Sequence, residues 1–156
     1  MNAQGKVEIQ VYTNVNKFSC TCEEASFVSE VNDASERVLK LPVSALKCPS
    51  KAMERDLREL FEADKYPYIS LYLDENNSAY VASNKDDVKT LIKVKQKQNR
   101  YDFQISEHEE DGETYLKGKE KVSLLDFDIE PPTKALGMIK VKDSVLISFL
   151  IPAEKL

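Results

Sequence analysis

Residues 41–73 read LPVSALKCPSKAMERDLRELFEADKYPYISLYL, and this stretch decides the fold. Its pattern predicts a strand, one short helix and a second strand. Pro49 and Ser50 supply a helix breaker followed by a good N-cap residue, so we expect a helix over 51–63. Because the rest of the chain shows only strand patterns, this lone helix has to pack on a sheet or close the end of a barrel.

The expected helix carries one apolar stripe. Its members recur at helical spacing: Met53, Leu57, Leu60 and Phe61. Charged residues fall off the stripe, and Glu54 with Arg58 makes a favourable pair four residues apart. Tyr66 precedes Pro67, a position biased to extended backbone, so the helix stops before it. We therefore expect the stripe to face the β-structure.

Strand patterns cover the remainder of the chain. Apolar and polar residues alternate in about eight segments, near 7–12, 18–31, 39–45, 67–73, 88–95, 101–106, 116–124 and 145–151. Turns are expected at 32–35 and 75–78 and at the strong hairpin signal 109–112, with a break at 98–100. The list is typical of an antiparallel sandwich or barrel. Long strands with one apolar face favour the barrel.

Size and charge narrow the class of protein. With 156 residues and no internal boundary, the chain is expected to form one domain over 1–156. A net charge of −5 argues against a nucleic-acid partner. No apolar run is long enough to span a bilayer, so an integral membrane protein is not expected. The polar start shows no signal peptide, and we expect that peptide to have been removed and Met1 added.

The chain has three cysteines, Cys20, Cys22 and Cys48. The odd count leaves at least one free thiol or an intermolecular bond. Either Cys20 or Cys22 can pair with Cys48 if the compartment is oxidising, and the sequence leaves both pairings open. A zinc site is disfavoured, because it needs four ligands and His108 is the only histidine. A catalytic thiol would also lack a histidine partner.

Three blocks of sequence together resemble the YceI-like family of lipid-binding proteins. They are TNVNKFSC at 13–20; LPVSALKC at 41–48 with Met53, Asp56 and the YPYI of 66–69; and DFDIEPP at 126–132 with LGMIKVKD at 136–143 and the final strand. Each block alone is weakly specific. Their order and spacing are more so, and they extend over nearly the whole chain.

The resemblance implies an all-β, mainly antiparallel fold: an eight-stranded, lipocalin-like extended β-barrel with one short helix. It implies that a lipid or isoprenoid-type amphiphile is held inside the barrel for transport, storage or sensing, without catalysis. No cofactor is expected apart from a bound polyisoprenoid or fatty-acid-like lipid. Family members are usually periplasmic or secreted, and a homodimer is an assembly that the sequence leaves open.

The chain departs from the family pattern at several positions. The region of Thr13 and Asn14 replaces a common His-Ser pair, and residues 91–94 lack a glycine-containing turn. An arginine that often precedes the DFGI stretch is missing, and Asp128 stands where a glycine is expected. These departures leave the fold unaffected and concern the contacts to the ligand's head group.

The apolar faces of the expected strands supply the candidate ligand-binding residues. They are Phe18, Ile69, Leu71, Ile92, Val94, Tyr101, Phe103, Ile147 and Phe149. A barrel of eight strands either fills itself with side chains or holds one small ligand. From the sequence pattern alone, a barrel filled by side chains is the more common outcome. The family resemblance instead favours a barrel that holds a ligand. Glu120 shares the inward parity of its strand, which indicates either the mouth of the barrel or a bulge.

Two other functions compete with lipid binding. One is an enzyme acting on a small apolar substrate in the barrel, which would need a catalytic group with a shifted pKa in the cavity. The other is an interaction module with a packed core. The lysines at 93, 95 and 97 and at 117, 119 and 121 indicate a solvated outer face more readily than a membrane-binding patch. We identify no catalytic or metal-binding residue.

Overall fold

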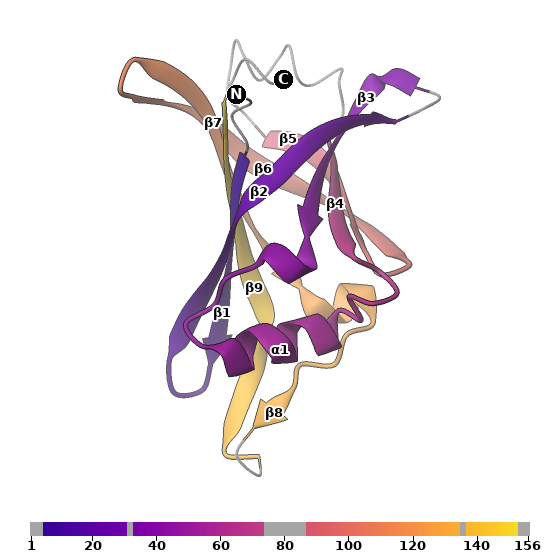
Figure 1. Cartoon of the computed structure of the whole chain (residues 1–156), viewed down its shortest axis with the longest axis vertical. Coiled ribbons are helices and arrows are strands. Elements are labelled where there is room, and N and C mark those ends of the chain that lie inside the picture. Colours follow the sequence, from indigo (N-terminus) through magenta and orange to yellow (C-terminus); the bar gives the residue numbers. More distant parts are fainter. Residues whose placement is uncertain (1–4, 31–32, 74–86, 135–136, 153–156) are drawn as a thin grey trace.

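The computed structural model describes residues 5–30, 33–73, 87–134 and 137–152 (Figure 1). Eight strands form an antiparallel barrel: β1 (Gly5–Thr13), β2 (Lys17–Glu30), β3 (Asp33–Pro42), β4 (Tyr68–Leu73), β5 (Asp87–Val94), β6 (Lys97–Glu110), β7 (Glu113–Ser123) and β9 (Ile139–Pro152). Each pairs with its neighbour in that order, and β1 pairs with β9 to complete the ring. The predicted all-β, eight-stranded antiparallel barrel is confirmed.

The strand that starts the barrel also closes it. On one side β1 pairs with β2, and on the other it pairs with β9 from Lys6 opposite Leu150 to Thr13 opposite Val141. Alternate residues of β1 are buried along its whole length. This alternation is what a barrel wall requires, because one face of each strand meets the interior and the other meets water.

The turn between β6 and β7 forms as predicted. It consists of Asp111 and Gly112, which have positive φ angles of 53° and 81°. Two positive φ angles in a two-residue loop match the right-handed twist of the adjoining strands, and Asp-Gly tolerates them. The hairpin extends beyond the barrel wall at the end opposite the helix (Figure 1).

Several predicted boundaries are wrong. β3 ends at Pro42, and Val43–Ala45 form the short 3-10 helix η1 instead of continuing the strand. The predicted break at 98–100 lies inside β6, and the actual turn is at residues 95–96. Residues 33–35 of the predicted turn at 32–35 belong to β3, and residue 32 and the turn at 75–78 lie outside the described residues.

Two further elements were not predicted. The 3-10 helix η2 spans Leu124–Phe127, where alternation alone had suggested the end of a strand. The two-residue strand β8 (Thr133–Lys134) pairs with the start of β9. Both lie near the helical end of the barrel.

Helix α1 spans Lys51–Leu60 and lies across one end of the barrel (Figure 1). Its N-cap is Ser50, as predicted, and the Ser50 Oγ accepts a hydrogen bond from the Met53 N–H at 3.2 Å. The helix ends three residues earlier than expected, because Glu62 adopts a left-handed backbone with φ 49°. The Glu62 carboxylate then binds the Lys95 ammonium at 2.9 Å, which ties this end of α1 to the β5–β6 turn.

The start of α1 is anchored by Glu54, a residue with a role that the sequence did not reveal. The Glu54 carboxylate is buried and accepts a hydrogen bond from the Cys48 N–H at 3.1 Å. Among the described ion pairs its partner is Lys51, at 3.9 Å, and not the expected Arg58. Glu54 therefore holds the first turn of α1 against the segment that precedes it.

A disulfide joins Cys20 to Cys48 and settles the pairing that the sequence left open. Thr21 of β2 forms an isolated antiparallel bridge with Lys47, through two backbone hydrogen bonds of 2.9 and 2.8 Å. In that register residue 20 falls opposite residue 48, and residue 22 falls opposite residue 46. Cys22 consequently stays a buried free thiol, and burial raises the pKa of that thiol.

The half of the barrel away from α1 is filled by side chains, and we call it the packed half. Its interior holds Leu71, Phe103, Ile105, Leu116, Phe149 and Ile151, each at most 4% exposed. The rings of Phe103 and Phe149 lie 5.6 Å apart between centroids. A Cβ atom at Gly118 would lie 2.4 Å from the Phe149 ring, so only glycine leaves room for that ring.

Candidate functional site

The other half of the barrel, under α1, encloses a cavity of about 680 Å³, and we call it the open half. The barrel contributes the greater part of the wall, through Ile9, Val11, Phe18, Ile69, Ile92, Val94, Val122, Val145 and Ile147. Helix α1 adds its apolar stripe, Met53, Leu57, Leu60 and Phe61. The prediction that this stripe faces the barrel is confirmed. A volume of this size is within the range of small-molecule sites.

The nine candidate ligand-binding residues divide between the two halves. Five line the cavity: Phe18, Ile69, Ile92, Val94 and Ile147. Leu71, Phe103 and Phe149 lie in the packed half, where they touch other side chains. Tyr101 packs against the core and lies outside the cavity lining as well. Alternation identified the inward faces of the strands correctly, but it cannot say at which height along a strand the interior stops being filled.

The cavity lies where two neighbouring strands separate. β6 pairs with β7 only as far as Gln104 opposite Lys119, although β7 continues to pair with β9 to Ser123 opposite Ser144. Toward α1, therefore, β6 and β7 share no ladder. Helix η2 fills part of this gap and places Phe127, which is 2% exposed, against the cavity.

Tyr101 bridges the separated strands. Its hydroxyl donates to the Asp126 carboxylate and accepts from the Ser123 N–H at 3.3 Å. Its ring lies 6.4 Å from that of Phe127, between centroids. Burial and the hydrogen bond to Asp126 both raise the pKa of Tyr101, so the hydroxyl stays protonated at neutral pH. Tyr101 thus joins β6 to η2 and to the end of β7, next to the cavity but outside its lining.

The separation of β6 from β7 also explains how Glu120 can share the inward parity of its strand and still be partly exposed. This residue pairs with Ile147 in an unbroken register, which rules out a bulge at this point. It lies on the part of β7 that has no β6 neighbour, and it is partly exposed. Its carboxylate accepts a hydrogen bond from the Lys121 N–H at 2.8 Å.

The exposed residues of the cavity lining include Val15 and Asn16 of the β1–β2 turn and Ser50 and Ala52 at the start of α1, beside Ile139 of β9, and we call this exposed part of the lining the mouth. The β1–β2 turn is stabilised by Thr13, whose hydroxyl accepts hydrogen bonds from the N–H groups of Val15 and Asn16 at 3.2 and 2.9 Å. Asn14 crosses to β9: its Nδ2 donates to the Met138 carbonyl at 3.0 Å, and its Oδ1 accepts from the Lys140 N–H at 2.8 Å.

Asp128 follows η2 in a left-handed conformation, with φ 58° and ψ 32°. The resemblance led us to expect glycine at this position, and the backbone angle gives the reason. Aspartate is among the few other residues that adopt this conformation readily. Its carboxylate binds the Lys97 ammonium at 3.0 Å, so the residue also links the η2 region to the start of β6.

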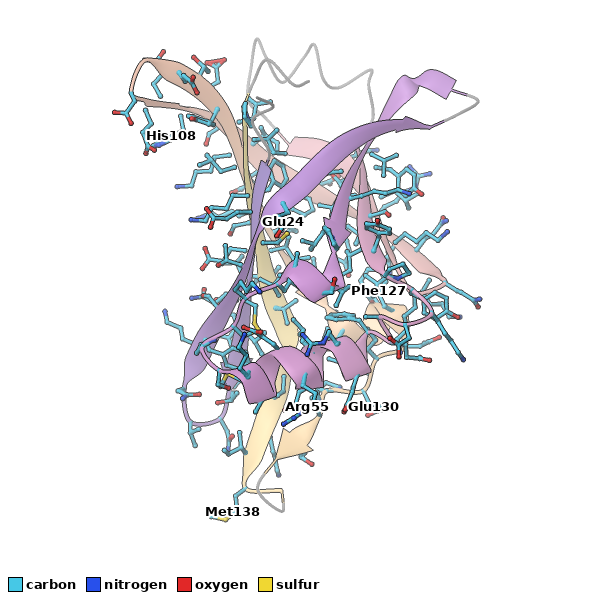
Figure 2. The ribbon with its side chains drawn as sticks, in the orientation of Figure 1. Glu24, Arg55, His108, Phe127, Glu130 and Met138 are labelled. Carbon is cyan, nitrogen blue, oxygen red and sulfur yellow. A yellow bond between two sulfur atoms is a disulfide. The ribbon has the colours of Figure 1, made fainter. Side chains whose placement is uncertain are left out.

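The charged groups around the cavity are few and acidic. Asp56 and Glu59 of α1 are the ionisable residues among its lining, which contains no lysine, arginine or histidine within the described part of the chain. His108 lies near the end of β6, in the hairpin far from the cavity (Figure 2). No group of three or more histidine, cysteine or acidic residues that could hold a metal ion occurs among the described residues.

Solved structures with the same architecture are found for nearly the whole chain. A polyisoprenoid-binding domain from Saccharophagus degradans has a TM-score of 0.72 at 12% identity, and the match covers 94% of this chain and 91% of that domain. This chain therefore shares the fold of that domain. BcnA from Burkholderia cenocepacia has a TM-score of 0.68 at 14% identity, with 94% of each chain covered.

A YceI protein from Campylobacter jejuni also shares the fold of this chain, at lower similarity. Its TM-score is 0.57 at 14% identity, and 97% of this chain and 84% of that one are covered. Scans against protein-family models and curated protein sequences give no match. Within the described ranges no helix is both long and apolar enough to cross a membrane.

Proposed function

We propose that this protein is a member of the YceI-like family and binds an isoprenoid-type lipid in the open half of its barrel, as a carrier, store or sensor. The observation that carries the proposal is the apolar cavity of about 680 Å³ between α1 and the barrel. One neighbour with the same fold is described as a polyisoprenoid-binding domain. The ligand would contact the five predicted residues that line the cavity and the apolar stripe of α1.

The composition of the wall supports an apolar ligand such as an alkyl or isoprenoid chain. Burial of an alkyl chain contributes about 0.8 kcal/mol per CH₂ group. About ten buried methylene groups would therefore contribute roughly 8 kcal/mol before the entropic cost of binding is subtracted. Affinity of this kind needs few polar contacts, which agrees with a wall made almost entirely of aliphatic and aromatic side chains.

The charges of the wall support an uncharged head group. The only ionisable side chains of the described lining, Asp56 and Glu59, are acidic. A fatty-acid carboxylate placed beside them would meet like charge without a cationic partner, whereas a neutral isoprenoid would not. Of the two ligand classes that we expected, the isoprenoid is therefore the one we propose.

We also propose that the site is not catalytic. The described lining contains neither a histidine nor a cysteine, and Cys22, the free thiol, is buried outside it. Tyr101, whose pKa is raised strongly, lies outside the cavity lining, and both of its polar contacts are made by the protein itself. The neighbour named for its ligand is called a binding domain.

For its location we propose the periplasm or the extracellular space. The support is the disulfide between Cys20 and Cys48, since such bonds persist in oxidising compartments and are rare in the cytosol. The homodimer and the exclusion of nucleic acid stay predictions.

The proposal is tested by extracting the purified protein with organic solvent and identifying the lipid by mass spectrometry. The informative variant is Leu57→Asp, because Leu57 lines the cavity and a carboxylate there would meet the apolar tail. We expect the lipid content to fall about tenfold or more. Because Leu57 is only partly buried, its replacement should cost less stability than a charge in the packed half would.

Leu125→Asp is the matched control. Leu125 lies on η2, is 51% exposed and does not line the cavity, so this variant should keep the lipid. Repeated wild-type extracts without lipid from a host that makes isoprenoids would contradict the proposal. Equal lipid content in the two variants would contradict the assignment of the site.

A further inference from the structure

The mouth of the cavity exposes apolar side chains at two adjacent tips. Val15, at the tip of the β1–β2 turn, is 64% exposed, and Met138, just before β9, is 76% exposed. Figure 2 shows Met138 at the extreme end of the molecule, beyond α1. Single exposed apolar residues are common on protein surfaces, but adjacent ones rimmed by polar residues can mark a protein or membrane interaction site.

The two tips form one connected surface. The amide of Asn14 binds the backbone of residues 138 and 140, and the Asn14 N–H donates to the Lys140 carbonyl at 3.1 Å. Val15 is the next residue along the turn. These hydrogen bonds keep Val15 and Met138 beside each other at the rim of the cavity, so the same partner can cover both.

The lysines around these tips carry positive charge in an acidic protein. Lys17, Lys140 and Lys142 are exposed on the strands that lead to the tips, and Lys51 is exposed on the first turn of α1. Lys51 is partly balanced by Glu54, whose side chain is 9% exposed. On the same side of the molecule Figure 2 labels Arg55 and the acidic Glu130, and Asp56 and Glu59 of α1 line the cavity, so the positive charge is confined to the strands next to the tips.

The opposite end of the barrel has the opposite charge. The tip of the β6–β7 hairpin carries five exposed acidic residues, Glu107, Glu109, Glu110, Asp111 and Glu113. The chain as a whole has a net charge of −5. A negatively charged surface would repel the acidic hairpin end, so the protein would orient with its mouth toward that surface.

We propose that the mouth docks on an anionic lipid bilayer, with Val15 and Met138 entering the head-group region and the neighbouring lysines contacting lipid phosphates. Charge complementarity selects this partner. Each lysine near an anionic surface strengthens binding by about 1 kcal/mol, which is roughly fivefold. Two apolar side chains add a contribution that does not depend on salt. The surface goes beyond the proposed lipid-binding function, and it would place the cavity entrance directly against the source or destination of the lipid.

The proposal is tested by sedimentation of the protein with phosphatidylcholine vesicles that contain or lack phosphatidylglycerol. We expect binding to the anionic vesicles, weakened by added salt, and little binding to the neutral ones. The double variant Lys140→Glu/Lys142→Glu should weaken binding by roughly 25-fold or more, from two lysine contributions. Met138→Ser, which removes the apolar side chain without adding a charge, should weaken it at low and high salt alike. Vesicle binding is measured apart from lipid extraction, so either proposal can fail without the other.

The matched control is Lys117→Glu/Lys119→Glu, which makes the same change of charge on the outer face of β7. If this control weakens binding as much as the mouth variant does, net charge alone governs attraction and the proposed surface is wrong. Absence of binding to either kind of vesicle would also overturn it. So would sedimentation equilibrium showing that the wild type is a dimer and that Met138→Ser makes it monomeric, because a second copy would then cover the mouth.

Discussion

The two halves of this barrel are built from the same strands and differ in what fills them. In the packed half, Phe103 and Phe149 meet above Gly118, and no side-chain-sized space is left there. In the open half, the inward positions of the same strands are aliphatic residues such as Ile92 and Ile147, and α1 lies across the end. The size of a few side chains, together with the separation of β6 from β7, determines where the barrel is hollow.

The comparison assigns different tasks to the two halves. Close packing of large side chains supplies stability, because each buried aromatic side chain removes a large apolar area from water. A cavity contributes less, since its wall lacks neighbours on one side. We infer that the packed half stabilises the fold and thereby permits an empty volume beside it.

The largest expected effect is the difference in stability lost when a phenylalanine of each half is truncated. Phe149→Ala removes a ring that is 3% exposed and should lower the free energy of unfolding by about 3–5 kcal/mol. Phe18→Ala removes a half-buried ring that lines the existing cavity and should cost less than half as much. Urea unfolding of both variants measures the difference. Equal losses would mean that the two halves do not differ in their contribution to stability.

The next effect concerns the covalent link beside the open half. The disulfide closes a loop with a sequence separation of 28, so the variant Cys20→Ala/Cys48→Ala should lose about 3 kcal/mol in the free energy of unfolding. Cys22→Ala, which removes the free thiol from the same face of β2, is the control and should lose about 1 kcal/mol. A smaller loss for the double variant than for the control would show that the link stabilises little.

A smaller effect is expected from one added methyl group. Gly118→Ala places a Cβ within 2.4 Å of the Phe149 ring and 2.6 Å of the Ile105 side chain, which should cost about 1–3 kcal/mol. Combined with Phe149→Leu, the same substitution should cost less than it does alone, because the smaller side chain makes room. A thermodynamic cycle of the two variants measures this coupling, and additive losses would argue against the contact.

The smallest effect is a pH dependence at the end of α1. The hydrogen bond and charge of Lys95 hold the pKa of Glu62 below its ordinary value. Its contribution to stability is therefore present above the unfolded pKa and lost as pH falls through the folded pKa. Lys95→Met should lower the melting temperature slightly near neutral pH and leave it unchanged in strong acid. Lys65→Met, which removes a more distant ammonium at 3.9 Å, should change it less.

Much of the architecture could be predicted from the sequence. Alternation located the eight barrel strands, Ser50 marked the start of α1, and Asp-Gly marked the β6–β7 turn. These are local signals, each set by the backbone preferences of a few neighbouring residues. The end of α1 and the end of β3 were placed wrongly, because those boundaries depend on left-handed and 3-10 backbone that the side-chain pattern does not reveal.

The candidate site was predictable only in part. Parity along the strands marked Ile92 and Phe103 alike as inward, but only Ile92 lines the cavity. What separates them is the partner across the barrel, such as the ring of Phe149, and no local pattern carries that information. Ile129 and Val141 also line the cavity and were not among the candidates, although both lie in sequence blocks that the family resemblance had singled out. The disulfide partner of Cys48 needed the Thr21–Lys47 register for the same reason.

The attachment of α1 at both ends limits how the cavity can adapt to its contents. The disulfide at Cys48 holds the segment before the helix, and the ion pair between Glu62 and Lys95 holds the segment after it. A helix attached at both ends is less free to move away from the barrel than one attached at a single end. Adjustment to longer or shorter molecules then falls to side-chain rotamers, above all the flexible thioether of Met53 in the wall. For the proposed ligand, selectivity by length would then depend on a few torsion angles on one face of the helix.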